Sequence, residues 1–259
     1  TLGGNIKAVR ISGIFDECQD LVKTAFDDEE FKTRVGLNSA NSINVSRLLA
    51  QVCYYFEAVA QLPKDKRDHV VFSVPCGNFG NITAGLIAKT LGLKSRFVIS
   101  CNANDTVPRY LQSGVWDPHK TIATLSNAMD ISRPNNWPRV EALIKMNGWN
   151  KSDFDFGSMS DEETCDTMRD LYSRTGYVLE PHAAIAYQIL KNSLKEGETG
   201  IFLGTAHPAK FKEVVDKTLG IDIALPEALE KRVALPMQAV TLKPDYENLK
   251  SYVLEAVKA

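Results

Sequence analysis

The residues of this chain best suited to chemistry form a glycine loop that follows a mostly apolar segment. Val70–Pro75 leads into Gly77-Asn78-Phe79-Gly80-Asn81, and a helical pattern begins directly after it. Gly77 and Gly80 let backbone N–H groups approach a ligand, and a helix N-terminus adds partial positive charge. The loop is neither a G-x-G-x-x-G fingerprint nor a Walker loop. It is either an anion site or an ordinary strand–helix turn with Asn81 as the cap.

A second polar group stands at the start of a helix predicted over Asn44–Leu62. Asn41, Ser42 and Arg47 place amide, hydroxyl and guanidinium groups around one helix N-terminus. Such a group can bind a phosphate. The alternative is a helix cap by one of the Asn or Ser side chains, with Arg47 in solvent. A second anion site beside the first favours binding.

A third group surrounds Thr205, between a predicted strand and a predicted helix. Its hydroxyl either caps the helix or faces the crevice at the carboxyl ends of the strands, where ligands bind in parallel sheets. His207 and Lys210 are expected to be exposed on the first turns of that helix. Glu180, before a proline, indicates a helix start. The polar stretch 127–139 either binds a ligand or covers an edge.

The elements that must position these residues alternate between strand and helix periods. Predicted strands are Ile6–Ile11, Val70–Pro75, Arg96–Cys101 and Gly200–Leu203. Predicted helices are one capped by Asp16, Asn44–Leu62, Ile82–Leu91, Thr106–Gln112, Trp137–Asn147, Glu162–Arg174, His182–Leu194, Pro208–Leu219 and Tyr246–Val257. Short loops between alternating elements predict an α/β fold, with a parallel sheet covered by helices on both faces. We expect a main domain over 1–235, with 102–164 a strand-poor surface elaboration, and a C-terminal helical extension over 236–259.

The composition narrows the class of protein. The 259 residues carry a formal net charge of −2 and 44% hydrophobic residues, which indicates an ordinary globular chain without a charge pattern for nucleic acid. No apolar run approaches the roughly 20 residues of a membrane span. Five scattered cysteines and four scattered histidines argue against disulfides and a metal site. We therefore predict a cytoplasmic protein that binds neither membrane nor nucleic acid, and no metal.

Five motifs, in order along the chain, together resemble those of the threonine synthase family. They are Asn41-Ser42-Ile43-Asn44 with Arg47, Gly77–Asn81, Asn102–Arg109, Asn127–Asp130 and Gly204–Phe211. The resemblance runs from residue 2 to about residue 235. It implies a pyridoxal 5'-phosphate (PLP) enzyme of the tryptophan-synthase-β fold type (fold type II), acting on O-phospho-L-homoserine and water to form L-threonine and phosphate.

The resemblance also implies roles for individual residues. Gly77, Asn78, Phe79, Gly80 and Asn81 would hold the cofactor phosphate through backbone N–H groups. Thr205 would lie against the pyridine nitrogen and leave it essentially unprotonated. Asn41, Ser42 and Arg47 would bind the substrate phosphate. The family often has Asp at the position that Asn81 occupies in this chain. The resemblance therefore implies no charged role for Asn81.

The resemblance places the Schiff-base lysine in a motif like Thr-x-x-Phe-Lys-Asp, upstream of the matched residues. This chain has no such motif and begins with Thr1. We expect it to be the C-terminal portion of the enzyme, without a catalytic residue of its own and inactive alone. Its oligomeric state, monomer or homodimer, stays open.

Two other functions remain possible on the sequence. One is another PLP-dependent β- or γ-replacement enzyme of the same fold type, although the Asn41–Arg47 group favours a phosphorylated substrate. The other is a non-catalytic module that binds a phosphorylated ligand.

Overall fold

A computed structural model describes residues 4–13, 15–233 and 235–258, and the chain forms two compact units. One unit comprises Thr1–Ala40 and Pro226–Ala259, and the other is the continuous segment Asn41–Leu225. These units do not coincide with the boundary that the sequence predicts at residue 235. The N-terminal segment belongs with the C-terminal one because their two strands pair with each other.

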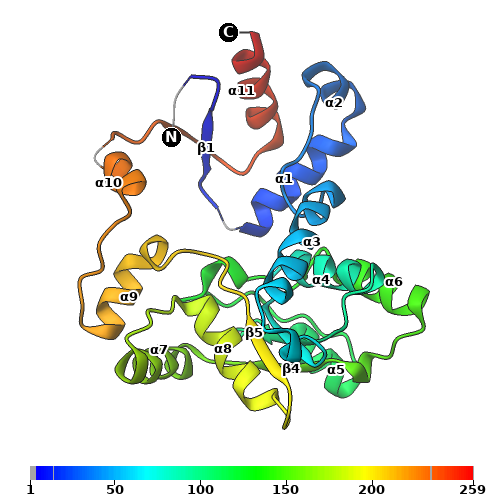
Figure 1. The fold of residues 1–259 in the computed structure, drawn as a ribbon. Coiled ribbons are helices and arrows are strands. Elements are labelled where there is room, and N and C mark those ends of the chain that lie inside the picture. Colours follow the sequence, from blue (N-terminus) through cyan, green and yellow to red (C-terminus); the bar gives the residue numbers. More distant parts are fainter. Residues whose placement is uncertain (1–3, 14, 234, 259) are drawn as a thin grey trace. The chain divides into compact units, whose positions relative to one another are not determined.

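The larger unit is built on four parallel strands, labelled in chain order in Figure 1 where space permits. They are β2 (Val70–Pro75), β3 (Ser95–Cys101), β4 (Asp155–Ser158) and β5 (Thr199–Phe202), and their order in the sheet is β4-β3-β2-β5. Each neighbouring pair is parallel. The predicted fold class is therefore confirmed.

Helices surround this sheet, and most begin and end near the predicted limits. They are α3 (Val45–Ala60), α4 (Gly80–Thr90), α5 (Thr106–Ser113), α6 (Trp137–Asn147), α7 (Asp161–Thr175), α8 (Pro181–Ser193) and α9 (Lys212–Leu219). Short 3-10 helices are η1 (Lys64–Lys66), η2 (Asn127–Met129), η3 (Lys151–Asp153) and η4 (Pro208–Phe211). The single helix predicted over Pro208–Leu219 is thus divided into η4 and α9.

The alternation of side chains along β2 explains why both faces of the sheet are covered. Val70, Phe72 and Val74 belong to a buried cluster with residues of α3, α4 and α6, while Val71 packs with residues of α8. Successive side chains of a strand point to opposite faces, so a run apolar at nearly every position needs a helix on each side. Ser73 satisfies its buried hydroxyl by donating to the carbonyl of Ala186, 2.7 Å away in α8.

The stretch 102–164 is more than a surface elaboration, which corrects the prediction. It supplies the edge strand β4, whose sequence Asp-Phe-Gly-Ser lacks the apolar pattern by which strands are recognised. It also supplies α6, whose Trp137, Val140 and Ile144 are buried in the same cluster as β2 and β3. The local sequence of β4 does not favour a strand. The segment is extended because it pairs with β3, in a register that begins with Val98 opposite Asp155.

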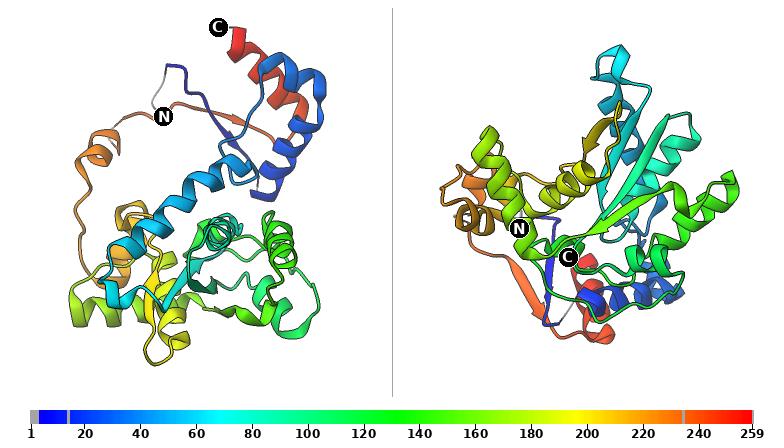
Figure 2. Two further views of the ribbon diagram at one scale, coloured as in Figure 1. Left: turned by 45° about the vertical axis from the view of Figure 1, so that its right-hand side comes forward. Right: turned by 90° about the horizontal axis from the view of Figure 1, so that it is seen from below.

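The smaller unit contains a two-stranded parallel sheet of β1 (Ala8–Ile11) and β6 (Ala239–Leu242). Figure 2 shows the blue β1 beside the orange β6. Its helices are α1 (Phe15–Asp27), α2 (Glu29–Val35), α10 (Glu227–Val233) and α11 (Tyr246–Lys258). The sequence does not predict the strand β6 or the helices α2 and α10, which are short elements of seven residues or fewer.

A polar contact joins the segments of this unit that are far apart in sequence. Asp28 accepts hydrogen bonds from Lys250 Nζ at 2.7 Å and from the Tyr246 hydroxyl at 2.8 Å. It also caps α2 by accepting from the N–H of Phe31. These hydrogen bonds lower the pKa of Asp28 to about 2, and the one from Lys250 has the largest effect.

No helix in the part of the chain that the structure describes is long and apolar enough to cross a membrane.

Candidate functional site

All nine residues that the sequence singles out for binding line one cavity of about 230 Å³ in the larger unit. They come from the N-terminal end of α3, from the loop between β2 and α4, and from the segment after β5. Its full lining is Asn41, Ser42, Arg47, Gln51, Pro75, Gly77, Asn78, Phe79, Gly80, Asn81, Ala128, Met129, His182 and Thr205. The cavity lies where β2 and β5 end, as expected for parallel strands.

The glycine loop turns sharply because of Phe79, the only non-glycine residue with a positive φ (60°) among those described. Phe79 is the N-cap of α4, and no side chain caps this helix. Its ring is buried against Trp137, with the two ring centroids 5.5 Å apart in an edge-on arrangement. Packing of this ring holds the strained backbone, and the first N–H groups of α4 have no side-chain acceptor.

Asn81 lies in the first turn of α4 and is not its cap. The Tyr54 hydroxyl donates to its side-chain oxygen, and the Tyr55 hydroxyl lies 2.7 Å from that oxygen and 2.9 Å from its carbonyl oxygen. Burial raises the pKa of both tyrosines, so both hydroxyls remain protonated donors. With its oxygen facing two donors, the Asn81 amide presents its NH₂ group as the donor.

The second polar group lies directly beside this loop. Asn44 is the N-cap of α3, because its side chain accepts from the N–H of Ser46 at 3.0 Å. Ser42 is therefore not the cap, and its hydroxyl accepts a hydrogen bond from Asn78 Nδ2 at 2.9 Å. The two predicted anion sites share this contact.

Close packing fixes the other side of the glycine loop. A Cβ atom at Gly77 would lie 2.7 Å from Met129 Cα and 3.0 Å from the carbonyl oxygen of Ala128. Two backbones therefore approach at a distance that only glycine permits. Asp130 holds this second segment by accepting from the Thr124 N–H and from the amides of Asn102 and Asn104. The motif residues after β3 thus support the cavity wall without lining it.

A buried Glu–His pair supports the same wall. Glu180, 1% exposed, caps α8 by accepting from the N–H groups of His182 and Ala183, which confirms the predicted helix start. It also lies 2.5 Å from His182 Nδ1, and His182 Nε2 accepts from the N–H of Ala128 at 3.2 Å. These contacts place the His182 proton on Nδ1 and hold the ring at the cavity.

Thr205 reaches the cavity, whereas two neighbours do not. The cap of η4 is His207, whose Nδ1 accepts from the N–H of Ala209 at 3.1 Å, so Thr205 is not a cap. Thr205 is exposed at the cavity, and neither His207 nor Lys210 lines it. As predicted, His207 and Lys210 are exposed.

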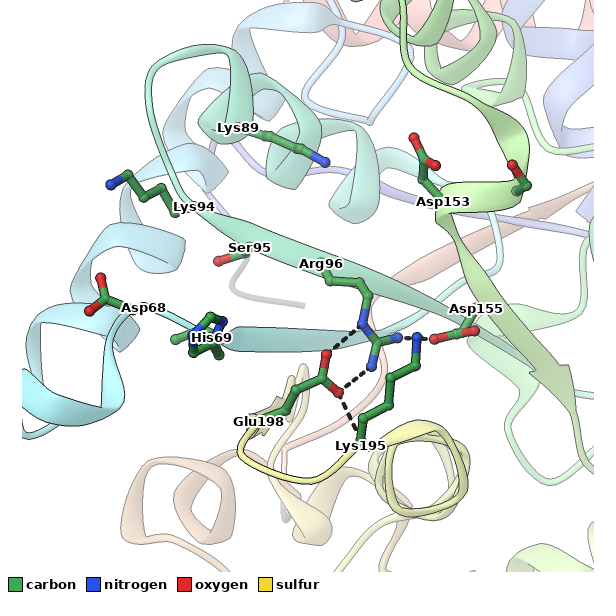
Figure 3. Close-up of a pocket in the computed structure, with 12 residues that line it drawn as sticks. Asp68, His69, Lys89, Lys94, Ser95, Arg96, Asp153, Asp155, Lys195 and Glu198 are labelled. Carbon is green, nitrogen blue, oxygen red and sulfur yellow. Dashed lines mark hydrogen bonds and ion pairs between the residues drawn. The ribbon is translucent and has the colours of Figure 1, made fainter.

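A second cavity, of about 480 Å³, lies at the opposite, amino-terminal end of the same strands (Figure 3). Its walls hold an ion-pair network centred on Arg96 of β3. Arg96 donates to Glu198 at 2.5 Å, to Asp155 of β4, and to the carbonyl of Ser193 at 3.0 Å. Asp155 lies on β4 beside β3, whereas Ser193 and Glu198 lie between the end of α8 and the start of β5, which pairs with β2. The network therefore joins elements of the sheet rather than presenting Arg96 as a free cation.

Sequence reasoning missed several residues that line the first cavity or contact its lining. Tyr54 and Tyr55 follow Arg47 by two helical turns, a spacing that places them on the same face of α3, and this is the signal that could have found them. Gln51 lies one turn after Arg47 on that face. Met129, from the stretch 127–139 whose role the sequence left open, and His182 meet the cavity only through tertiary contacts.

Comparison with known proteins gives the same picture. Residues 1–205 match the family model described as pyridoxal-phosphate dependent enzyme, and residues 183–253 match the C-terminal family of threonine synthase. A threonine synthase of Haemophilus influenzae is 65% identical over 257 residues, which are 99% of this chain and 60% of that protein. The chain spans about 60% of the length of the curated relatives it matches.

Solved structures agree with this result. The crystal structure of threonine synthase from Escherichia coli has a TM-score of 0.95 and 57% identity, over 98% of this chain and 60% of that one. The PLP-bound threonine synthase of Brucella melitensis has a TM-score of 0.87 and 32% identity, over 100% of this chain and 61% of that one. The predicted resemblance is confirmed, and with the family model covering residues 1–205 the chain belongs to the pyridoxal-phosphate dependent enzymes.

Proposed function

We propose that this chain is the part of a threonine synthase that binds the phosphates of PLP and of O-phospho-L-homoserine. The reaction would convert O-phospho-L-homoserine and water to L-threonine and phosphate. The observation that carries this proposal is the single cavity lined by Asn41, Ser42, Arg47, the loop 77–81 and Thr205. Residues far apart in sequence meet there with the groups that two phosphates and a pyridine ring require.

The glycine loop fits the cofactor phosphate. The uncapped first turn of α4 offers N–H groups and the positive end of an 11-residue helix. The NH₂ group of Asn81 adds a neutral donor, so no carboxylate opposes the anion. Thr205 offers an exposed hydroxyl to the pyridine nitrogen at the same cavity. A hydroxyl, unlike a carboxylate, would leave that nitrogen unprotonated.

The residues at the N-terminal end of α3 are suited to binding the substrate phosphate. Arg47 is the cation of this region, and Ser42 and Asn41 add neutral polar groups beside it. A guanidinium binds phosphate through charge-assisted, often bidentate hydrogen bonds. Since phosphate leaves the substrate in this reaction, the same groups would stabilise the charge that develops on the leaving oxygen.

When bound, PLP would supply the electron sink that allows the α- and β-carbons of the substrate to lose protons. The residues of this chain would orient the cofactor ring through its phosphate and nitrogen. They would also hold the substrate phosphate at a fixed distance from that ring. Loss of phosphate from the γ-carbon would be followed by addition of water at the β-carbon, so one water is consumed for each phosphate released.

The test measures phosphate release and threonine formation by the gene product isolated at its natural length (the native protein), not by a polypeptide of these 259 residues alone. O-phospho-L-homoserine and O-acetyl-L-serine are the competing candidate substrates. We expect turnover of the phosphorylated substrate alone, and at least about a tenfold rise in its KM in Arg47→Gln. Arg34→Gln changes an exposed arginine of α2 and is the matched control. Preference for O-acetyl-L-serine would favour another replacement enzyme, and binding without turnover would favour a non-catalytic module.

We also propose a cytoplasmic location and either a monomer or a homodimer. All five cysteines are free thiols, as expected in a reducing compartment. Fractionation of cells and size-exclusion chromatography with light scattering of the native protein test these two points.

A further inference from the structure

Arg139 lies behind the cavity and contacts the polypeptide on both sides of it. Its Nη1 donates to the carbonyl of Ser42 at 2.8 Å, and its Nη2 donates to the carbonyl of Ile43 at 2.7 Å. Nη1 also donates to the side-chain oxygen of Asn136 at 2.6 Å. The three acceptors are neutral oxygens, and Arg139 itself does not line the cavity.

Asn136 continues this chain of hydrogen bonds to the glycine loop. Its side-chain NH₂ donates to the carbonyl of Asn78 at 2.9 Å, and the N–H of Asn135 donates to the Asn78 side-chain oxygen at 2.7 Å. Asn78 in turn donates to the Ser42 hydroxyl. The ring Arg139–Asn136–Asn78–Ser42–Arg139 is therefore closed, and it joins the head of α3 to the loop before α4.

The start of α6 is unfavourable by local rules, which indicates that these contacts serve something other than this helix. Asn136 is its N-cap residue, yet its side chain makes no capping hydrogen bond. Arg139 places a positive charge in the first turn, against the helix dipole. Trp137 Nε1 is buried without a hydrogen-bond partner among the described residues. Local rules are broken in this way mainly at functional sites.

We propose that Arg139 is a positioning residue that sets the separation between the two phosphate sites, an inference that rests on the proposed function. Its planar guanidinium reaches three acceptors at once and so fixes the carbonyls of Ser42 and Ile43 relative to Asn136 and Asn78. A lysine ammonium keeps the charge but cannot reproduce this planar arrangement. The geometry of the fork, and not its charge alone, would therefore matter.

The experiment compares Arg139→Gln and Arg139→Lys with the native cofactor-loaded protein. The dissociation constant of inorganic phosphate is measured by calorimetry, the KM and kcat for O-phospho-L-homoserine by turnover, and the unfolding midpoint by heating. We expect phosphate affinity to fall at least about tenfold and KM to rise in parallel in both variants. Arg169→Gln, at an exposed ion pair of α7, should leave all of these values unchanged.

Three results would overturn the proposal. One is a lower unfolding midpoint with unchanged phosphate affinity, which would assign Arg139 a merely structural role. Another is full recovery in Arg139→Lys, which would assign the effect to charge. The third is absence of phosphate binding to the native protein. Failure of the proposed function is distinguishable, because native protein that binds phosphate but does not turn over O-phospho-L-homoserine would still show the loss of affinity in both variants.

Discussion

At the scale of single residues, the cavity depends on a few positions where the chain allows no substitute. Gly77 faces the backbone of Met129, and Asn81 is held by two buried tyrosines. Neither requirement is visible in the residue itself. Glycine is needed at 77 because another segment passes within van der Waals distance, and the amide of Asn81 is oriented because phenols on α3 reach it.

Replacement of Gly77 by alanine should weaken PLP binding. Its Cβ would meet backbone atoms of Ala128 and Met129, so either the loop or its neighbour must shift. Overpacking of this kind costs about 1–3 kcal/mol, which is roughly tenfold or more in affinity when a binding loop moves. Fluorescence titration of PLP into the native apoprotein measures the change.

Gly204→Ala is the matched control, because nothing lies within 4 Å of a Cβ at that residue and its φ is not positive. Equal PLP affinity in the Gly77 variant and the native protein would show that the loop tolerates the extra methyl group.

At the scale of elements, the helices that begin at the cavity differ in whether a side chain caps their N-terminus. The capped starts of α3 and α8 are stabilised by Asn44 and Glu180, whereas α4 begins without a side-chain cap at the cavity. An uncapped N-terminus leaves N–H groups for a ligand, at a cost in stability. The start of α4 thus leaves N–H groups at the cavity, where the proposed function places the cofactor phosphate.

Removal of the Glu180 side chain should destabilise the larger unit. In Glu180→Ala the first N–H groups of α8 lose their acceptor and His182 Nδ1 loses its partner, all in buried surroundings. We expect a loss of about 2–4 kcal/mol in the free energy of unfolding. Urea unfolding followed by circular dichroism measures it, with the exposed Glu196→Ala as control. A loss of less than about 1 kcal/mol would contradict this role.

At the scale of the whole molecule, the two compact units are stabilised differently. The larger unit has a four-stranded sheet buried on both faces, whereas the smaller one has two strands and four helices. Two-stranded sheets are marginal by themselves. The polar contact of Asp28 with Lys250 and Tyr246 joins the two segments of the smaller unit.

The stability of the smaller unit should therefore decline in acid. The pKa of Asp28 is about 2 in the folded chain against an ordinary 3.8, so folding favours its ionised form. The contribution of ionised Asp28 to the stability of the folded chain is fully present above about pH 4 and is lost as the pH falls through about 2. In Asp28→Asn, which keeps a capping oxygen, unfolding should depend less on pH in this window.

Urea unfolding between pH 2 and pH 6 checks this expectation. Asp20→Asn, at an exposed residue of α1, is the control and should retain the native pH dependence. The same slope in the native and Asp28→Asn proteins would argue against the contact.

We further predict that a polypeptide of these 259 residues forms no specific one-to-one linkage with PLP and makes no threonine. In the proposed function its residues would bind two phosphates and a pyridine ring, but the chain has no Thr-x-x-Phe-Lys-Asp motif. Incubation with PLP and borohydride, followed by peptide mass spectrometry, is the test. A single lysine of this chain carrying the reduced cofactor in a 1:1 ratio would contradict the prediction, whereas partial labelling of many exposed lysines would not.

The sequence by itself determined the α/β class, the order of most elements and nine of the fourteen residues that line the cavity. This was possible because strand and helix periods, glycine turns and cap residues are local signals, and because the motifs occur in the order typical of one family. The exceptions are elements without local signals: β4 has a polar sequence, and β6 pairs with a strand some 230 residues away.

Only the tertiary structure decided how these residues work together. It brought Ser42 within 2.9 Å of Asn78, it set Ala128 against Gly77 and His182, and it connected Arg139 to both sides of the cavity. Such contacts join segments 36 to 97 residues apart. These contacts arise because α3, α6 and α8 pack around one sheet. No pattern within a single segment indicates which distant segment it will contact.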